Sequence, residues 1–575
     1  MKRTFIFLTT LCAAALLASC YDDKGNYDYH EINDIEITTS EYSYTTPKEG
    51  MTGQVVIEPT ITQTMTPGTE NLAYEWKRQT GGVSWEVVGT DPTYTLVVTS
   101  DDKAAIYLRL AVTDTNQGIT TYEEITVKPI AKFRQTWFLL QEIDGAAVLG
   151  SVDGSGSSRV VTADVYRQET GTPLAGKPVG LGMHNQYNTA EYGIGENYQT
   201  LLGVFTDAKP YILDGSTLEE HRLNYQRLLY EKKIKNDPTF DPQLMKGNKN
   251  NFPIIDAGKF WYSSPDEFAL LFPIVLSDEL GGGYDYKAAG VGFTTRSQCI
   301  IYDELGNRFL RFLDGEARGM LRNTRQSIAN GGGTNDQLYM DILNGTSTQA
   351  KYLQKITSMG EGKPDHPNEF DPDHLASGFK LDWMGASQGD YCETILTIGH
   401  VGQNFQVYEI NAWALDNIDI GTNLPYCSKA WTFPVADAEA ATTDGKIPVA
   451  SSSRFERLMF YAAGNKIYRV NLSQTSPVSE AIYETASPDD RIKFLKFKSD
   501  NLNIAHQDGD SFVYTYVTGD LGAVVEDAEG NARLVELPLT VAGEVDRDAE
   551  KNPVVYEFKG FEHVKDFIFS FRPID

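Results

Sequence analysis

The stretch IYLRLAVTDTNQGITTYEEITVKP, residues 106–129, decides the fold of the first part of the chain. From Tyr107 to Asp114 the residue types alternate with a period of two, which is typical of a strand with one buried face. Asn116-Gln117-Gly118 then supplies turn residues, and a second alternating run follows. The stretch therefore predicts two antiparallel strands joined by a tight turn.

The flanking sequence extends this pattern over residues 31–130. Alternating runs recur in IEITTSEYSYTT, GQVVIEPTIT, LAYEWKR and YTLVVT. About seven short strands separated by turn residues predict an antiparallel β-sandwich of the immunoglobulin type. Trp76, in AYEWKR, is expected to be the core aromatic of a central strand.

Residues 131–575 repeat a looser theme, in which an apolar strand, a Gly/Asp/Asn turn and a second strand recur. Examples are LLGVFTDAKPYILDG at 201–215 and CIIYDELGNRFLRFLDG at 299–315. Radial repetition of small sheets is the arrangement of a β-propeller. We expect about seven blades with long insertions between strands, because the spacing of the theme is uneven. Two or more separate β-sandwiches are the alternative, and either arrangement makes the chain all-β.

The first residues resemble a bacterial lipoprotein signal. Lys2 and Arg3 precede an apolar run, residues 5–17, which is too short to span a bilayer but fits a secretory signal. Leu17-Ala18-Ser19-Cys20 resembles a lipobox, so cleavage after residue 19 and lipidation of Cys20 are expected. Residues 20–30 would then form a lipidated acidic tether. An ordinary signal peptide is the alternative.

Two further motifs carry a family resemblance. The residues after the cysteine, Tyr21-Asp22-Asp23-Lys24, resemble the export signal of Bacteroidetes lipoproteins, with Asp22 and Asp23 as its acidic residues. Together with YEWKR and YLRLAVTDTNQG, the opening SCYDDKGNYDY resembles the PKD-like family of surface lipoproteins. The Trp-Asp-Phe-Gly-Asp-Gly turn of true PKD domains is missing, so any function tied to that turn is in doubt.

The resemblance implies a location and a role. Such a lipoprotein is anchored in the outer membrane, faces the cell exterior and is associated with a SusC/SusD-type importer. The expected function is accessory capture of a nutrient, glycan or peptide. A propeller-type hydrolase and a scaffold that binds no nutrient are the alternatives.

Composition narrows the classes of partner and cofactor. The formal net charge of -29 argues against nucleic acid as a partner, since phosphates require a basic surface. The three cysteines after Cys20 are far apart and form no CxxC pair, and we expect them to be buried thiols. No cofactor motif is present, because the glycine-rich runs lack the Lys-Ser/Thr of a phosphate loop.

Motifs for catalysis and metal binding are weak. Residues 385–389 read GASQG and match G-x-S-x-G, but a strand-like run follows where a nucleophile elbow needs a helix. The run PDHPNEFDPDH clusters carboxylates with imidazoles, and its candidate ligands are His366, Asp371, Asp373 and His374. Three prolines and the lack of an HExxH pattern favour a solvated loop, so we predict neither a catalytic residue nor a metal.

Aromatic residues are the remaining candidates for ligand contact. Sugar rings and peptide side chains both pack on aromatic planes. Trp261, Tyr262 and Trp383 stand nearest to loop signals in the second part of the chain. We therefore expect them to contact the ligand, although propeller cores also use Trp and Tyr.

Overall fold

The computed structural model divides the chain into two compact units, Met1–Ala131 and Lys132–Asp575, next to the boundary predicted at residue 130. Within them the structure describes residues 32–46, 52–129, 132–133, 135–154, 159–188, 198–221, 224–229, 232, 235–247, 252–263, 272–273, 285–293, 299–312, 353–356, 370–386, 394–416, 426–442, 445–498, 503–508, 511–516 and 519–571. No helix among these residues has the length and apolar character needed to cross a membrane.

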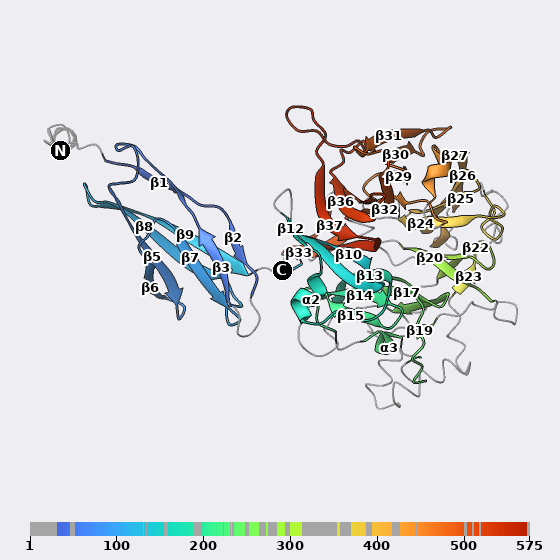
Figure 1. The fold of residues 1–575 in the computed structure, drawn as a ribbon, viewed down its shortest axis with the longest axis horizontal. Coiled ribbons are helices and arrows are strands. Elements are labelled where there is room, and N and C mark those ends of the chain that lie inside the picture. Colours follow the sequence, from blue (N-terminus) through green and yellow to red (C-terminus); the bar gives the residue numbers. More distant parts are fainter. Residues whose placement is uncertain are drawn as a thin grey trace, which may run out of the picture. The chain divides into compact units, whose positions relative to one another are not determined.

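The first unit is the predicted sandwich (Figure 1). One sheet has five strands in the order β2 (Tyr42–Tyr44), β9 (Ile119–Pro129), β8 (Ile106–Asp114), β5 (Leu72–Thr80) and β6 (Ser84–Gly89). Two strand pairs complete the sandwich: β1 (Ile35–Thr38) pairs with β4 (Thr60–Gln63), and β3 (Thr52–Ile57) pairs with β7 (Tyr94–Thr99).

The core of the sandwich forms around Trp76, as its position in an alternating strand predicts. Its side chain is fully buried and stacks on Tyr94, with ring centroids 5.6 Å apart. The indole Nε1 donates a hydrogen bond of 2.8 Å to the carbonyl oxygen of Asp91. The polar edge of a large buried ring is thereby satisfied, which a buried Trp requires.

The described residues of the second unit form seven small blades, and the strands of each blade are given from the innermost outward. Strands within a blade pair antiparallel, whereas blades 2 and 3 are joined into one seven-stranded sheet by parallel pairing of their innermost strands. Blade 1 is β38 (Val564–Phe571), β10 (Gln135–Ile143), β11 (Ala146–Asp153) and β12 (Val160–Thr162); blade 2 is β13 (Pro178–Asn188), β14 (Tyr198–Thr206) and β15 (Pro210–Asp214); blade 3 is β16 (Pro242–Gly247), β17 (Phe252–Asp256), β18 (Lys259–Ser263) and β19 (Phe272–Pro273); blade 4 is β20 (Ala288–Phe293), β21 (Cys299–Asp303), β22 (Arg308–Phe312) and β23 (Leu353–Lys355).

The remaining blades follow the same order. Blade 5 is β24 (Lys380–Ala386), β25 (Thr394–Val401), β26 (Asn404–Asn411) and β27 (Cys427–Pro434); blade 6 is β28 (Val449–Ala450), β29 (Leu458–Ala463), β30 (Lys466–Asn471) and β31 (Ser479–Glu484); blade 7 is β32 (Arg491–Phe497), β35 (Leu521–Glu526), β36 (Asn531–Leu537) and β37 (Tyr556–Glu562). A hairpin of β33 (Asn503–Asp508) and β34 (Ser511–Tyr516) is inserted in blade 7. Short helices among the described residues are α2 (Val165–Thr170), α3 (Tyr225–Leu228), α7 (Ala412–Asp416) and α8 (Ala438–Ala441).

The blades close into a ring because the two ends of the unit share blade 1. The last strand, β38, pairs antiparallel with the first strand, β10, in a register that joins Trp137 to Phe569. The innermost strands then neighbour one another from β38 through β13, β16, β20, β24, β28 and β32 and back to β38, with β20 reached through β17. In Figure 1 the ring begins at β10, in cyan, and ends at β37, in red, and β37 lies beside β10. The propeller fold is thus confirmed, and separate sandwiches are excluded.

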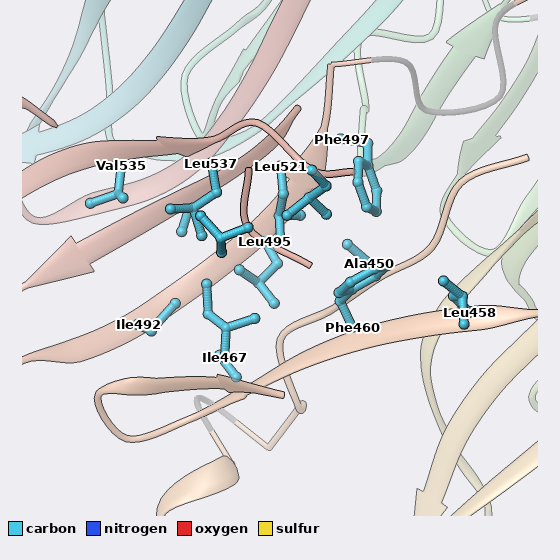
Figure 2. Packing of buried hydrophobic residues seen from close by; sticks show 14 of the residues in the cluster. Ala450, Leu458, Phe460, Ile467, Ile492, Leu495, Phe497, Leu521, Val535 and Leu537 are labelled. Carbon is cyan, nitrogen blue, oxygen red and sulfur yellow. The ribbon is translucent and has the colours of Figure 1, made fainter. Parts of the chain in front are cut away.

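Apolar side chains fill the space between neighbouring blades. Figure 2 shows Ile492, Leu495 and Phe497 of β32 packed against Phe460 and Ile467 of blade 6. All five side chains are buried. Since each blade buries both faces against its neighbours, its strands read as nearly continuous apolar runs and not as strict alternation.

The recurring aspartates of the sequence theme have a structural role in three consecutive blades. Asp207, Asp256 and Asp303 lie at or just after the end of the second strand of blades 2, 3 and 4. Each carboxylate accepts the backbone N–H of the residue just before the first strand, at 2.6, 2.9 and 2.9 Å respectively. The turn after the second strand is thereby fixed to the entry of the innermost strand.

Candidate functional site

The most distinctive polar group inside the propeller lies on β24, the innermost strand of blade 5. The pairing of β24 with β25 shifts register between Leu381 and Trp383, so Asp382 is the extra residue of a β-bulge. Bulges redirect side chains, and they are frequent next to functional sites. Here the bulge allows Asp382 and Trp383 to reach the same region, between blade 5 and the segment that enters blade 6.

Asp382 and His400 form a buried pair. His400 Nδ1 lies 2.7 Å from Asp382 Oδ2, and the two side chains are 7% and 0% exposed. Asp382 Oδ1 accepts the backbone N–H of Ile447 at 2.8 Å. Burial raises the pKa of Asp382 above its usual value, although the bonds from His400 and Ile447 oppose this effect.

This arrangement has two possible uses. With Nδ1 held by Asp382, a neutral His400 carries its lone pair on Nε2, which is the orientation of a general base positioned by a carboxylate. The same bonds also tie β24 and β25 to Ile447 ahead of blade 6. The pair therefore positions an imidazole and stabilises a contact between two blades.

Trp383 is the predicted ligand-contact residue that lies beside this pair. Its ring is half-buried and packs against the apolar cluster that includes Ile398 and Ile447. Trp431, on the outermost strand of the same blade, is half-buried against the same cluster. Trp383 therefore keeps a partly exposed surface, as a contact residue requires.

Trp261 and Tyr262 lie elsewhere, on β18 of blade 3, and their positions do not fit the predicted role. Trp261 is 4% exposed within an apolar cluster, and Tyr262 is 1% exposed against Phe312, with ring centroids 4.2 Å apart. Neither ring presents a face to solvent on which a sugar or peptide could stack. Both serve the core, which is the use that propellers make of many aromatic residues.

The acidic and histidine-rich loop also shows internal pairing. His374 Nδ1 lies 2.9 Å from Asp371 Oδ2, and both are exposed. Asp373 faces cationic side chains instead, with Lys355 Nζ at 3.5 Å and Arg308 Nη1 at 3.9 Å. The described part of the chain contains no group of three or more His, Cys, Asp or Glu residues placed to hold a metal.

Several predicted residues lie outside the described ranges. These are Cys20, Asp22, Asp23, His366, residues 387–389 of the G-x-S-x-G match, and Cys392, one of the three cysteines expected to be buried. Cys299 and Cys427 are described, and both are buried as predicted.

Sequence reasoning missed the Asp382–His400 pair. The two residues are 18 positions apart, and neither belongs to a recognisable motif. The signals present, Asp382 in KLDWM and His400 after TILTIG, become informative only once the register of β24 against β25 is known.

Comparison with solved structures gives propeller-like relatives at low identity. A quinonprotein alcohol dehydrogenase-like protein of Bacteroides thetaiotaomicron is 10% identical, over 92% of this chain and 96% of that one, with a TM-score of 0.38. AztD of Citrobacter koseri is 8% identical, over 87% and 100%, with a TM-score of 0.29. PorZ, a surface component of the type-IX secretion system of Porphyromonas gingivalis, is 10% identical, over 92% and 60%, with a TM-score of 0.17.

Comparison with protein families and curated proteins gives one family. No curated protein matches the chain. The matching family covers the whole sandwich and continues through β10, β11, β12 and α2 of the propeller. Residues 20–178 match the model of the PKD-like family.

Proposed function

We propose that this chain is a surface-exposed outer-membrane lipoprotein that captures a nutrient, glycan or peptide, for a SusC/SusD-type uptake system. One observation carries the proposal. The PKD-like match begins at Cys20, the residue predicted to be lipidated, and the sandwich inside that match is a compact unit separate from the propeller. A lipid anchor, a spacer domain and a large β-domain in this order suit display at a cell surface.

Trp383 is the candidate contact residue of the propeller. The ring is partly exposed, and Trp383 follows Asp382 directly in the chain, at the bulge of β24. Ligand sites commonly combine an apolar surface with a few fixed polar groups. The net charge of -29 disfavours polyanions, so a neutral glycan or a peptide is the expected ligand.

The anchor is tested in cells. Cys20→Ala should abolish lipid labelling and release the mature protein from membranes, because a single stable anchor is lost. Replacing Asp22 and Asp23 with Ala should retain the lipid but reduce protease accessibility on whole cells. Membrane retention of the Cys20→Ala protein would contradict the lipoprotein assignment, and unchanged accessibility of the double variant would remove the export signal.

The partner and the ligand are tested together on the native lipoprotein purified in detergent. Co-purification of an importer and binding of a neutral glycan or peptide from a panel are both expected. Trp383→Ala should weaken binding by ~1–3 kcal/mol if the ring stacks on the ligand, by analogy with bases on aromatics. Trp431→Ala is the matched control, since it removes a half-buried Trp from the same blade and cluster. An importer that co-purifies without any ligand binding would favour the scaffold role.

A hydrolase is the second candidate, and the Asp382–His400 pair is the observation that favours it. His400 could accept a proton from water at Nε2 while Asp382 holds Nδ1. Product release from a glycan or peptide by the purified protein, lost in His400→Gln, would establish this activity. Binding without turnover in the same assay would contradict the hydrolase, and the Asp382–His400 pair would then only stabilise the contact between blades 5 and 6.

A further inference from the structure

One face of the five-stranded sheet of the sandwich carries aromatic and ion-paired side chains. Along β8 the side chains of Leu108 and Leu110 are buried in the core, whereas Tyr107 and Arg109 point away from it. On the neighbouring strand β9, Glu124 lies opposite Arg109 in the register. The side chains on this outward side of the sheet do not belong to the core of the sandwich.

Two tyrosines on this side are widely exposed. Tyr107 is 49% and Tyr122 60% exposed, which is unusual for large aromatic side chains. Tyr122 lies opposite Ala111, four residues along β8 from Tyr107. At ~3.4 Å per residue, the two tyrosines are about 14 Å apart along the strand direction. One sugar ring cannot reach both, but an oligosaccharide chain can.

A third aromatic residue is held in place on the same side. The guanidinium carbon of Arg109 lies 4.3 Å from the ring centroid of Trp85. Arg109 Nη2 also contacts Glu124 Oε1 at 2.6 Å. An Arg fixed by a carboxylate restrains the indole that stacks on it, so less freedom is lost when a ligand binds. We call Trp85, Tyr107, Arg109, Tyr122 and Glu124 the aromatic face.

Two ion pairs within the sheet lie on and around the aromatic face. Besides Arg109 and Glu124, Lys77 Nζ lies 2.6 Å from Glu75 Oε1 on the adjacent strand β5. Thr113 and Thr120 add a hydroxyl pair with oxygens 2.9 Å apart. Aromatic planes, two ion pairs and hydroxyl groups on this surface offer both stacking and hydrogen bonds. This chemistry matches a neutral chain rich in hydroxyl groups better than an ion or an apolar protein surface.

We propose that the aromatic face binds a neutral polysaccharide chain, which spans Tyr107 and Tyr122. The sandwich would then be a second binding module and not only a spacer. This inference rests on the proposed function, because it names the glycan as the ligand class and adds a contact surface outside the propeller.

The test is binding of the full mature protein to a panel of neutral polysaccharides in affinity gel electrophoresis. Tyr107→Ala and Tyr122→Ala should each weaken binding by about tenfold or more, as loss of aromatic stacking does for other ring ligands. Tyr107→Phe and Tyr122→Phe keep the ring and should retain most of the binding. Val97→Ala is the matched control, since Val97 is 46% exposed on β7, outside this sheet. Binding should change little between low and high salt, because a neutral glycan makes no ionic contact with the protein.

Each other result overturns the inference in a distinct way. If glycan binding persists in the Tyr107→Ala and Tyr122→Ala proteins but falls in Trp383→Ala, the proposed function holds and the aromatic face is not the site. If the tyrosine variants lose binding of an unstructured peptide and not of a glycan, the face binds a different class of ligand. If the wild-type protein binds no glycan in the panel, the inference fails. The importer association measured separately then decides whether the proposed function fails with it.

Discussion

Trp137 Nε1 donates a hydrogen bond of 2.8 Å to Glu536 Oε2, joining the first and last blades of the propeller. Trp137 lies on β10 of blade 1, and Glu536 on β36 of blade 7. Arg159, just before β12, forms two bonds with the same carboxylate. Lys498 Nζ adds a contact of 2.8 Å to Glu536 and one of 2.6 Å to Asp520. The ring is thus closed by a buried ionic cluster as well as by strand pairing.

Removing the central carboxylate of this cluster should destabilise the propeller strongly. The Arg159 and Glu536 side chains are each only 1% exposed, so Glu536→Gln leaves two buried cations with one remaining acid, Asp520. Breaking a buried ion pair in this way costs ~3–5 kcal/mol. Urea unfolding of the propeller should show this loss. In the control Glu220→Gln, which breaks an exposed pair with Lys209, the change should stay below ~1 kcal/mol. Similar losses in both proteins would contradict the role of the cluster.

Close contact between blades 2 and 3 should depend on one glycine. Strands β13 and β16 pair in parallel, and a Cβ on Gly182 would lie 2.5 Å from the Cβ of Met245. Gly182→Ala should therefore lower stability by ~1–3 kcal/mol through overpacking. Gly180→Ala, on the same strand, meets its nearest atom at 3.6 Å and should change stability little. Thermal unfolding of the two variants checks this difference. Equal unfolding temperatures would show that β13 and β16 can move apart without loss of stability.

The stability of the propeller should fall in mild acid because of His184. Complete burial lowers the pKa of His184 to about 3, and its ring packs edge-on against Phe252. The unfolded chain binds the proton near pH 6.5, so between pH 6.5 and about 3 protonation favours unfolding. The free energy of unfolding should drop by up to ~1.4 kcal/mol per pH unit in this window. From pH 7 to pH 4, the free energy of unfolding should fall less steeply with pH in His184→Gln than in the wild-type protein. The exposed His374→Gln serves as the control and should keep the original slope.

The sequence predicts features that repeat locally and misses those that depend on register. Alternation around Trp76 and the aspartates of the propeller theme recur in short stretches, so they identify the sandwich and the blades before any contact is known. Trp261 and Trp383 show the limit of this reasoning. Both stand near loop signals in the sequence, yet one is 4% exposed and the other half-buried, because depth in a propeller depends on the neighbouring blade. The bulge at Asp382 and the aromatic face likewise appear only once strands are paired.

The propeller should fold without the sandwich but not without its last strand. All seven blades lie within residues 132–575, and β38 supplies the innermost strand of blade 1 from the end of that range. Asp566 on β38 also contacts both neighbouring innermost strands, through the backbone N–H of Leu181 at 2.9 Å and Lys496 Nζ at 2.7 Å.

A fragment of residues 132–575 should therefore unfold in a single cooperative transition, and the sandwich fragment of residues 20–131 should do the same. A fragment of residues 132–563, which lacks β38, leaves β10 without its inner partner and exposes the apolar side chains that Phe567 and Phe569 cover. It should bind a hydrophobic dye and lose its cooperative transition, whether or not the sandwich is attached. Cooperative unfolding of the shortened fragment at the same urea concentration would show that the strand pairing at blade 1 is not what closes the ring.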